Sequence, residues 1–341
     1  MNHIERVKET LAHHQPDRIP SFMGRIDDLP HWCKCFQVKD EEELRSFLQL
    51  DIRKVYYRGC FRPEKGKNIW GASDIFGSYG SGRGSYPLAG AETVADIENY
   101  NWPSPDTLDM EFYGNRVNGM DPQFPLILSL GDLFVLNTMM DMIGMEDSLV
   151  LMMSEPAVVE ATIAHIESFI METMKRVMEA HAHKAFAFWF ADDFSTQRGM
   201  MISPDLWRKF LKPTYKRIFD LIKSYNLQVW FHSCGSFKLV MPDLVDMGMD
   251  IWETVQAHLD GNDPVELKKK FGDKLSFFGA INCQKTLPYG SPEDVRKEVR
   301  ERIRILGKNG GYICGPDHSI QANMPPENII SLFDEIRKCT G

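Results

Sequence analysis

Short apolar runs alternate with longer amphipathic stretches in the second half of the chain. The apolar runs are rich in aromatic and β-branched residues and predict strands at 185–191, 228–232, 250–255, 275–281 and 310–314. Two stretches between them, 203–226 and 291–309, have helical periodicity and begin with Ser-Pro, a capping residue followed by a proline suited to the first turn. Strands that alternate with helices are typical of βα units in a parallel sheet.

The first half of the chain adds three expected strands, at 18–24, 51–59 and 124–130. Eight βα units in 341 residues predict one (β/α)8 TIM barrel, a single α/β domain over residues 1–341. A stretch rich in Gly, Ser and Tyr near residues 61–110 stands where one βα connection is expected. We interpret it as an inserted segment, and insertions of this size commonly cover the active site of a barrel.

Charge and composition narrow the class of protein. The 39 Lys and Arg residues are outnumbered by 48 Asp and Glu residues, and no basic cluster interleaves with aromatics, so nucleic acid is not an expected partner. No apolar run approaches the roughly 18–20 residues of a membrane span. The polar N-terminal segment has no signal-peptide pattern, so we expect a cytoplasmic protein whose seven cysteines are reduced thiols or metal ligands.

Candidate functional residues follow the expected strands, because catalytic groups of TIM barrels come from the C-terminal strand ends. Each of the last five strands ends in polar or metal-binding side chains, namely Asp192 and Asp193, His232 and Cys234, Glu253 and Gln256, Asn282 and Cys283, and Cys314, Asp317 and His318. Their gathering at one rim predicts a functional site there.

The segment "VWFHSCGSF" (229–237) places His232 and Cys234 two residues apart at a strand end, so both side chains can face the same object. A thiolate and an imidazole suit zinc, although short His-x-Cys pairs also occur by chance and are then only packed. A catalytic zinc takes three protein ligands and leaves a fourth position open. The third ligand is either Cys314 or His318. Asp192 and Asp193 have a structural alternative, since such a pair can cap the next helix or bind Arg198.

Several segments carry a family resemblance. They are "QPDRIP" (15–20), "YPLAGAETVADIENYNWPSPD" (86–106), "DDFSTQRGMMISPDLWRKFLKP" (192–213), "FHSCGS" (231–236), "FGDKLSFFGAIN" (271–282) and "PPENII" (325–330). On these segments, which span nearly the whole chain, the protein resembles the uroporphyrinogen decarboxylase superfamily, and more closely its cobalamin-dependent methyltransferase branch. The resemblance implies a (β/α)8 barrel.

Two chemistries occur in that superfamily. Its decarboxylases are cofactor-free and carry an arginine-rich N-terminal motif that receives substrate carboxylates, whereas the matching "FMGRIDDLP" here flanks Arg25 with acids. Its methyltransferases use a His-x-Cys-Gly element and a later cysteine as zinc ligands. His232-Ser233-Cys234-Gly235 matches that element, and the later turn aligns with "GPDHSI" (315–320), which favours His318 over Cys314. Gln256 falls where some relatives have an acidic residue near the zinc, which implies a weak fourth contact there, with Glu253 as a substitute.

The resemblance implies a zinc-dependent methyltransferase that acts on a small-molecule methyl donor or acceptor. We favour demethylation of a methylated, for example methoxylated, small molecule over methylation of a thiol. The corrinoid (cobalamin) is expected on a partner protein, because no cobalamin-binding "DxHxxG" element occurs in the sequence. Asp192 and Asp193 are the expected catalytic residues, and substrate contacts are expected from Gln197, Glu253, Gln256, Asn282 and Asp317. Dimers are common among such barrels, so a homodimer is one expected assembly.

Two alternatives remain open. A metal-free decarboxylase or lyase on the same barrel would leave His232, Cys234 and His318 as ordinary rim residues. A non-catalytic protein that binds a corrinoid or tetrapyrrole would bind its ligand without turnover, and the gathering of polar groups at one rim argues against it.

Overall fold

The computed structural model describes residues 1–55, 59–73, 86–131 and 133–339. Seven parallel strands form a curled sheet in the order β1-β2-β3-β6-β7-β8-β9. They are β1 (Arg53–Lys54), β2 (Leu126–Ser129), β3 (Ala187–Ala191), β6 (Gln228–His232), β7 (Ile251–Val255), β8 (Ser276–Ile281) and β9 (Tyr312–Pro316). A separate antiparallel hairpin consists of β4 (Ser195–Thr196) and β5 (Gly199–Met200). The sheet is the inner part of the expected TIM barrel.

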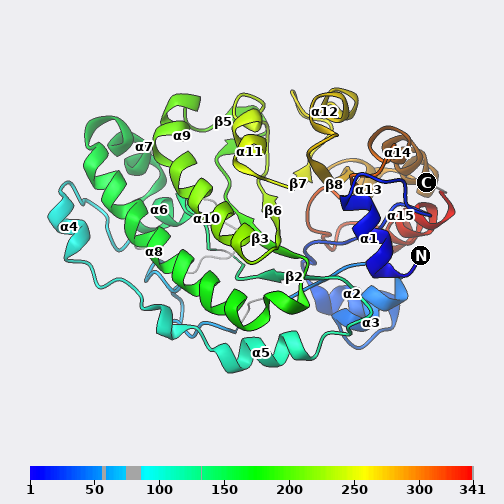
Figure 1. Ribbon diagram of the computed structural model, residues 1–341, viewed down its shortest axis with the longest axis horizontal. Coiled ribbons are helices and arrows are strands. Elements are labelled where there is room, and N and C mark those ends of the chain that lie inside the picture. The colour runs from blue at the N-terminus through cyan, green and yellow to red at the C-terminus, as the bar shows by residue number, and fades with distance from the viewer. Residues whose placement is uncertain (56–58, 74–85, 132, 340–341) are drawn as a thin grey trace.

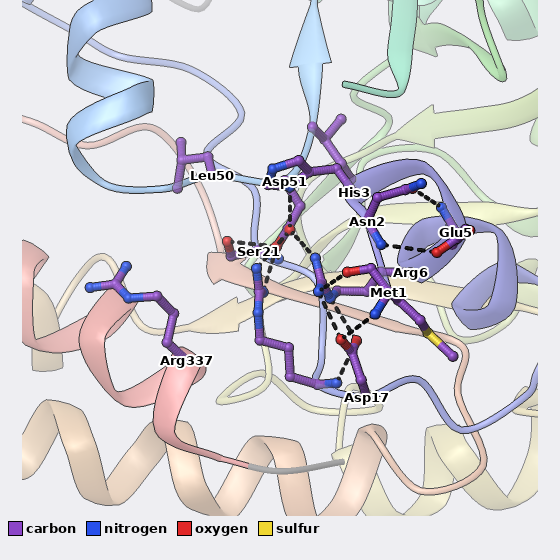
Figure 2. A network of polar contacts seen from close by, with 12 residues as sticks. Met1, Asn2, His3, Glu5, Arg6, Asp17, Ser21, Leu50, Asp51 and Arg337 are labelled. Atoms are coloured by element: carbon purple, nitrogen blue, oxygen red, sulfur yellow. Dashed lines mark hydrogen bonds and ion pairs between the residues drawn. The ribbon is translucent and has the colours of Figure 1, made fainter. Parts of the chain in front are cut away.

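The segment around Ser21 occupies the eighth position of the barrel. It forms a parallel bridge to Cys314 of β9, and its other side is bonded to the residues before β1, where the Asp51 N–H donates to the Ser21 carbonyl at 3.0 Å. The expected strand at 18–24 is therefore present in position but shortened to a bridge. Pro20 explains this in part, because it has no N–H to donate to a ladder. Figure 2 shows Ser21 and Asp51 side by side at this closure.

Helices surround the strands, with α8 to α11 on one side and α13 to α15 on the other (Figure 1). The α-helices are α1 (His3–Leu11), α2 (Leu29–Phe36), α3 (Glu41–Phe47), α4 (Val94–Glu98), α5 (Met110–Asn118), α6 (Leu136–Ile143), α7 (Met145–Ser154), α8 (Pro156–His181), α9 (Pro204–Phe210), α10 (Lys212–Ser224), α11 (Met241–Met247), α12 (Pro264–Phe271), α13 (Thr286–Tyr289), α14 (Pro292–Leu306) and α15 (Pro326–Lys338). Two short 3-10 helices are η1 (Pro105–Thr107) and η2 (Ala182–Lys184). Among the described residues, no helix is both long and apolar enough to cross a membrane.

The helix expected at 291–309 is confirmed as α14, which begins after a capping box made by Ser291 and Asp294. The one expected at 203–226 is two helices, α9 and α10, which meet at Leu211. Pro213 accounts for the break, because its ring would clash with the carbonyl four residues earlier in a continuous helix.

Two apolar layers lie on opposite faces of the strands. Phe22, Trp230 and Phe278 come from strand positions that are not neighbours, yet the Trp230 ring lies 5.6 Å from Phe22 and 5.5 Å from Phe278, so all three fill the barrel interior. Trp189 belongs to the same buried cluster, whereas Phe231 belongs to the layer between strands and helices. Side chains alternate between the two faces along a strand. A residue beyond the strand end therefore faces the barrel mouth when it stands an even number of positions after an interior residue.

The segment expected as an insertion, near residues 61–110, lies in the connection from β1 to β2 and contains α4 and η1, and α5 follows it. Its described part packs against α8: the Trp70 ring lies 4.9 Å from Phe169, and Trp102 stacks on His165 at 4.7 Å. The middle of the segment, residues 74–85, lies outside the described residues, so the expectation that the insertion covers the site stays a prediction.

Candidate metal centre

His232 ends β6, and its side chain faces the barrel mouth because it stands two residues after the interior Trp230. Cys234 follows as the chain leaves the strand. Gly235 then has φ +92°, a conformation that glycine adopts without strain. A Cβ at Gly235 would lie 2.6 Å from the carbonyl oxygen of Thr196 in the β4–β5 hairpin. The glycine is therefore required by a backbone approach that fixes the position of the preceding thiol.

His318 completes a group of three ligands. It follows β9. One ligand atom from each of His232, Cys234 and His318 lies within 4.8 Å of the other two. The distance from Cys234 Sγ to His232 Nε2 is 3.6 Å. A tetrahedral zinc with ordinary Zn–S and Zn–N bonds would separate its sulfur and nitrogen ligands by about 3.6 Å. The donor set and its spacing therefore fit zinc, with a fourth position left for a ligand.

Glu253, on the adjacent strand β7, orients the His232 ring. Its Oε1 lies 3.1 Å from His232 Nδ1, and its Oε2 accepts from the indole N–H groups of Trp189 at 3.0 Å and Trp230 at 2.5 Å. A metal-binding imidazole commonly bonds a carboxylate through its other nitrogen, which fixes the ring orientation. Nε2 of His232 is thereby left facing Cys234.

Electrostatics favour charged groups at this centre despite burial. Burial opposes an imidazolium at His232, but the neighbouring Cys234 thiolate and Glu253 carboxylate raise its pKa well above the ordinary value. Burial and Asp193 act to raise the pKa of Cys234, yet His232 and His318 outweigh them and lower it. Burial also acts against the Glu253 carboxylate, but His232 and Lys54 hold its pKa down at about 2. A thiolate is the form of cysteine that binds metal.

Cys314, the alternative third ligand, lies apart from this group. Its strand neighbour Ile313 faces the barrel interior, so Cys314 faces the helical layer. Burial raises its pKa to about 12, and its surroundings include Tyr312 and Cys339. Of the two residues expected as third ligand, the structure brings only His318 to His232 and Cys234.

Asp192 and Asp193 point in opposite directions. Asp192 is fully buried and accepts from the backbone N–H groups of Val135, Leu136 and Asn137 at 2.7–3.2 Å, which caps the N-terminus of α6. Burial raises its pKa to about 6, although these donors favour the charged form. Asp193 accepts from the Cys234 N–H at 2.7 Å. Asp193 thus lies at the metal centre and Asp192 at a helix end.

A family model described as uroporphyrinogen decarboxylase (URO-D) matches residues 79–339. The chain belongs to the uroporphyrinogen decarboxylase family. It is 22% identical over 264 residues to a uroporphyrinogen decarboxylase of Pseudoalteromonas atlantica, a match that covers 72% of this chain and 68% of the relative. It is also 25% identical over 150 residues to a methylated-thiol–coenzyme M methyltransferase of Methanosarcina mazei, covering 43% of this chain and 36% of that protein.

A solved methyltransferase structure from Methanosarcina mazei has the same fold. It superimposes with a TM-score of 0.76 at 15% identity and covers 99% of both chains. The resemblance to the uroporphyrinogen decarboxylase superfamily is confirmed, relatives of the methyltransferase kind are among the matches, and the expected TIM barrel is the fold.

The remaining expected site residues of this family member lie on the same rim but differ in their hydrogen-bond partners and exposure. Gln256 accepts from the Gly235 N–H at 2.8 Å, and Asn282 accepts from two N–H groups of the turn before α13. Asp317 accepts from the Cys283 N–H at 3.0 Å, while its Oδ2 is buried without a hydrogen-bond partner, 3.8 Å from His258 Nδ1. Gln197 is exposed in the turn of the β4–β5 hairpin. Of the four, Asp317 is the one with a buried side-chain atom that has no hydrogen-bond partner.

Several residues around the metal-binding side chains were not expected from the sequence. Trp189 and Trp230 were assigned only to apolar strands, and Lys54 was not singled out, although a lysine two positions after the interior Ile52 is unusual. Ser319 was missed as well: its Oγ lies 3.0 Å from His318 Nδ1 and donates to Asp27 at 2.8 Å. These contacts join segments far apart in the sequence.

Proposed function

We propose that this protein is a zinc-dependent methyltransferase that works with a separate corrinoid protein and removes a methyl group from a small methylated substrate, such as a methoxylated compound. The observation that carries the proposal is the His232, Cys234 and His318 group at the barrel mouth, with the ligand spacing of tetrahedral zinc. The methyltransferase relatives support the reaction class.

Zinc bound by these three residues would supply a Lewis acid that lowers the pKa of a thiol or polarises the oxygen of a methyl ether. The chain's own residues prepare the site for it. His232 and His318 favour the thiolate form of Cys234, and Glu253 fixes the His232 ring. Asp193 bonds the Cys234 backbone and is the carboxylate we assign to substrate orientation or proton handling. Asp317 Oδ2 offers a further acceptor at the rim.

Decarboxylation is the second candidate, because uroporphyrinogen decarboxylases are among the relatives. Arg25 argues against a polycarboxylate substrate. Its Nε donates to Asp27 at 2.8 Å, so the charge that a substrate carboxylate would need is already paired within the chain.

Zinc content of protein purified without a histidine tag tests the proposal. We expect about one zinc per chain, lost in His232→Ala, Cys234→Ser and His318→Ala, and retained in the matched control Cys314→Ser. Chemically reduced free cobalamin should gain a methyl group from a methoxylated substrate, which absorbance detects, and Cys234→Ser should abolish this. Wild-type protein that holds no zinc after zinc is supplied would reject the proposal in favour of the decarboxylase.

A further inference from the structure

A buried cation lies inside the barrel beneath the metal centre. Lys54 is on β1, two residues after Ile52 of the interior cluster, so its side chain also faces the interior. It is 7% exposed. Its Nζ lies 3.5 Å from the centroid of the Trp189 ring, over the ring face. A buried ammonium group is unfavourable unless its surroundings compensate the charge, and the Trp189 ring face is one of the groups that do so.

The contacts continue from Lys54 to a metal ligand in three steps. The Lys54 ammonium lies on the Trp189 ring, the Trp189 N–H donates to Glu253 Oε2 at 3.0 Å, and Glu253 Oε1 lies 3.1 Å from His232 Nδ1. A cation over an indole face is attracted to the electron density of the ring and withdraws it from the N–H. The N–H then donates more strongly to the carboxylate, and hydrogen bonds to a charged acceptor are the strong ones.

We infer that Lys54 is a positioning residue of the metal centre, which acts through Trp189 and Glu253 to hold the His232 ring with Nε2 directed at Cys234. The inference rests on the proposed metal site. The three residues that lead to His232 come from three different strands: β1 supplies Lys54, β3 supplies Trp189 and β7 supplies Glu253. A role in packing alone would predict that an apolar side chain of similar length serves as well at this position.

The test compares Lys54→Met with Lys54→Arg. The zinc Kd is measured by competition with a chromogenic chelator, and the cobalt(II)-substituted protein gives an absorption spectrum that reports ligand geometry. We expect Lys54→Met to weaken zinc binding about tenfold or more, as removal of an outer-shell partner does, and to shift the cobalt bands. Lys54→Arg keeps the cation and should retain most of the affinity. Lys268→Met is the matched control, because Lys268 is half-buried in the helical layer and donates to the Gly310 carbonyl.

Trp189→Phe provides a second route if Lys54→Met does not fold, since it keeps a ring beneath the ammonium and removes only the indole donor. It should weaken zinc binding in the same direction. A zinc Kd and cobalt spectrum equal to wild type in Lys54→Met, or in Trp189→Phe where only that variant folds, would overturn the inference and leave the proposed function standing. Wild-type protein that binds no zinc would reject both.

Discussion

At the scale of single residues, the neighbouring carboxylates Asp192 and Asp193 have different tasks because the strand before them alternates. Trp189 and Ala191 face the barrel interior, so Asp193 continues toward the mouth and reaches the Cys234 N–H. Asp192 faces outward, where three backbone N–H groups of the first turn of α6 and the Tyr215 hydroxyl surround it. An anion at a helix N-terminus is stabilised by the unpaired N–H groups and by the helix dipole.

Asp192→Asn should destabilise the fold without affecting zinc. The amide replaces one acceptor oxygen by a donor, which then meets N–H or O–H groups instead of binding them, and we expect a loss of about 1–3 kcal/mol in the free energy of unfolding. Urea denaturation measures the loss, and zinc content should stay at the wild-type level. Asp193→Asn is the comparison for the loss of stability, because its amide oxygen can still accept from the Cys234 N–H. An Asp192→Asn variant with wild-type stability and no activity would instead assign Asp192 to catalysis.

At the scale of elements, the β4–β5 hairpin holds the loop that carries Cys234. The Ser195 hydroxyl donates to the Cys234 carbonyl at 2.5 Å, and the Ser236 N–H donates to the Thr196 carbonyl at 3.0 Å. Gly235 lies between these two contacts with its α-carbon against the hairpin. The geometry of the thiol therefore depends on how closely this hairpin approaches.

Gly235→Ala should weaken zinc binding as well as stability. Its Cβ would lie 2.6 Å from a backbone oxygen at a positive φ, so the hairpin or the Cys234 loop must move; we expect a loss of about 1–3 kcal/mol in stability and a higher zinc Kd. Thermal unfolding and chelator competition measure the two effects. Gly66→Ala is the control, because Gly66 also has positive φ but its Cβ would meet nothing within 4 Å. Equal zinc affinity in both variants would show that the contact between the hairpin and Gly235 does not affect zinc binding.

Some strands and site residues could be predicted from the sequence, and others could not. The strands after residue 185 and the pair His232 and Cys234 were predictable, because aromatic and β-branched runs mark strands and i, i+2 spacing marks one face of a strand. The choice between Cys314 and His318 was not settled by the residues themselves, since a continuously apolar strand does not reveal which face turns inward. The contacts of Lys54, Trp189 and Glu253 depend on the register of strands far apart in the chain, which a single sequence does not contain.

At the scale of the whole molecule, the barrel is closed by a buried charge cluster at the end opposite the metal centre. Asp51 is fully buried just before β1 and accepts from His3, Arg6, Arg18 and Ser21 at 2.7–3.1 Å. Figure 2 shows Arg6 of α1 and the Ser21 segment converging on this carboxylate. The cluster joins α1, the shortened first strand position and β1, the three parts that meet where the sheet would otherwise be open.

Asp51→Asn should therefore loosen the closure in a pH-dependent way. Burial alone would raise the pKa of Asp51, but hydrogen bonds from His3 and Arg18 and the charge of Arg18 hold it well below its usual range. A carboxylate with a lowered folded-state pKa stabilises the fold above its unfolded-state pKa of about 4 and loses that contribution as pH falls. At pH 7 we expect the variant to lose about 3–5 kcal/mol in the free energy of unfolding, the usual effect of breaking a buried pair.

Urea denaturation of wild type and Asp51→Asn at several pH values between 7 and 3 measures this contribution, because other titrating groups affect both proteins alike and cancel in the difference. The difference should be largest near neutral pH and should shrink as the pH falls below about 4. Asp17→Asn removes a carboxylate that binds the same Arg6 but is 38% exposed, so its effect should be smaller, since solvent screens exposed pairs. Zinc content should be unchanged in both variants, since the metal centre lies at the other end of the barrel. A difference that stays constant with pH would mean that Asp51 closes the barrel through packing and neutral hydrogen bonds instead of through its charge.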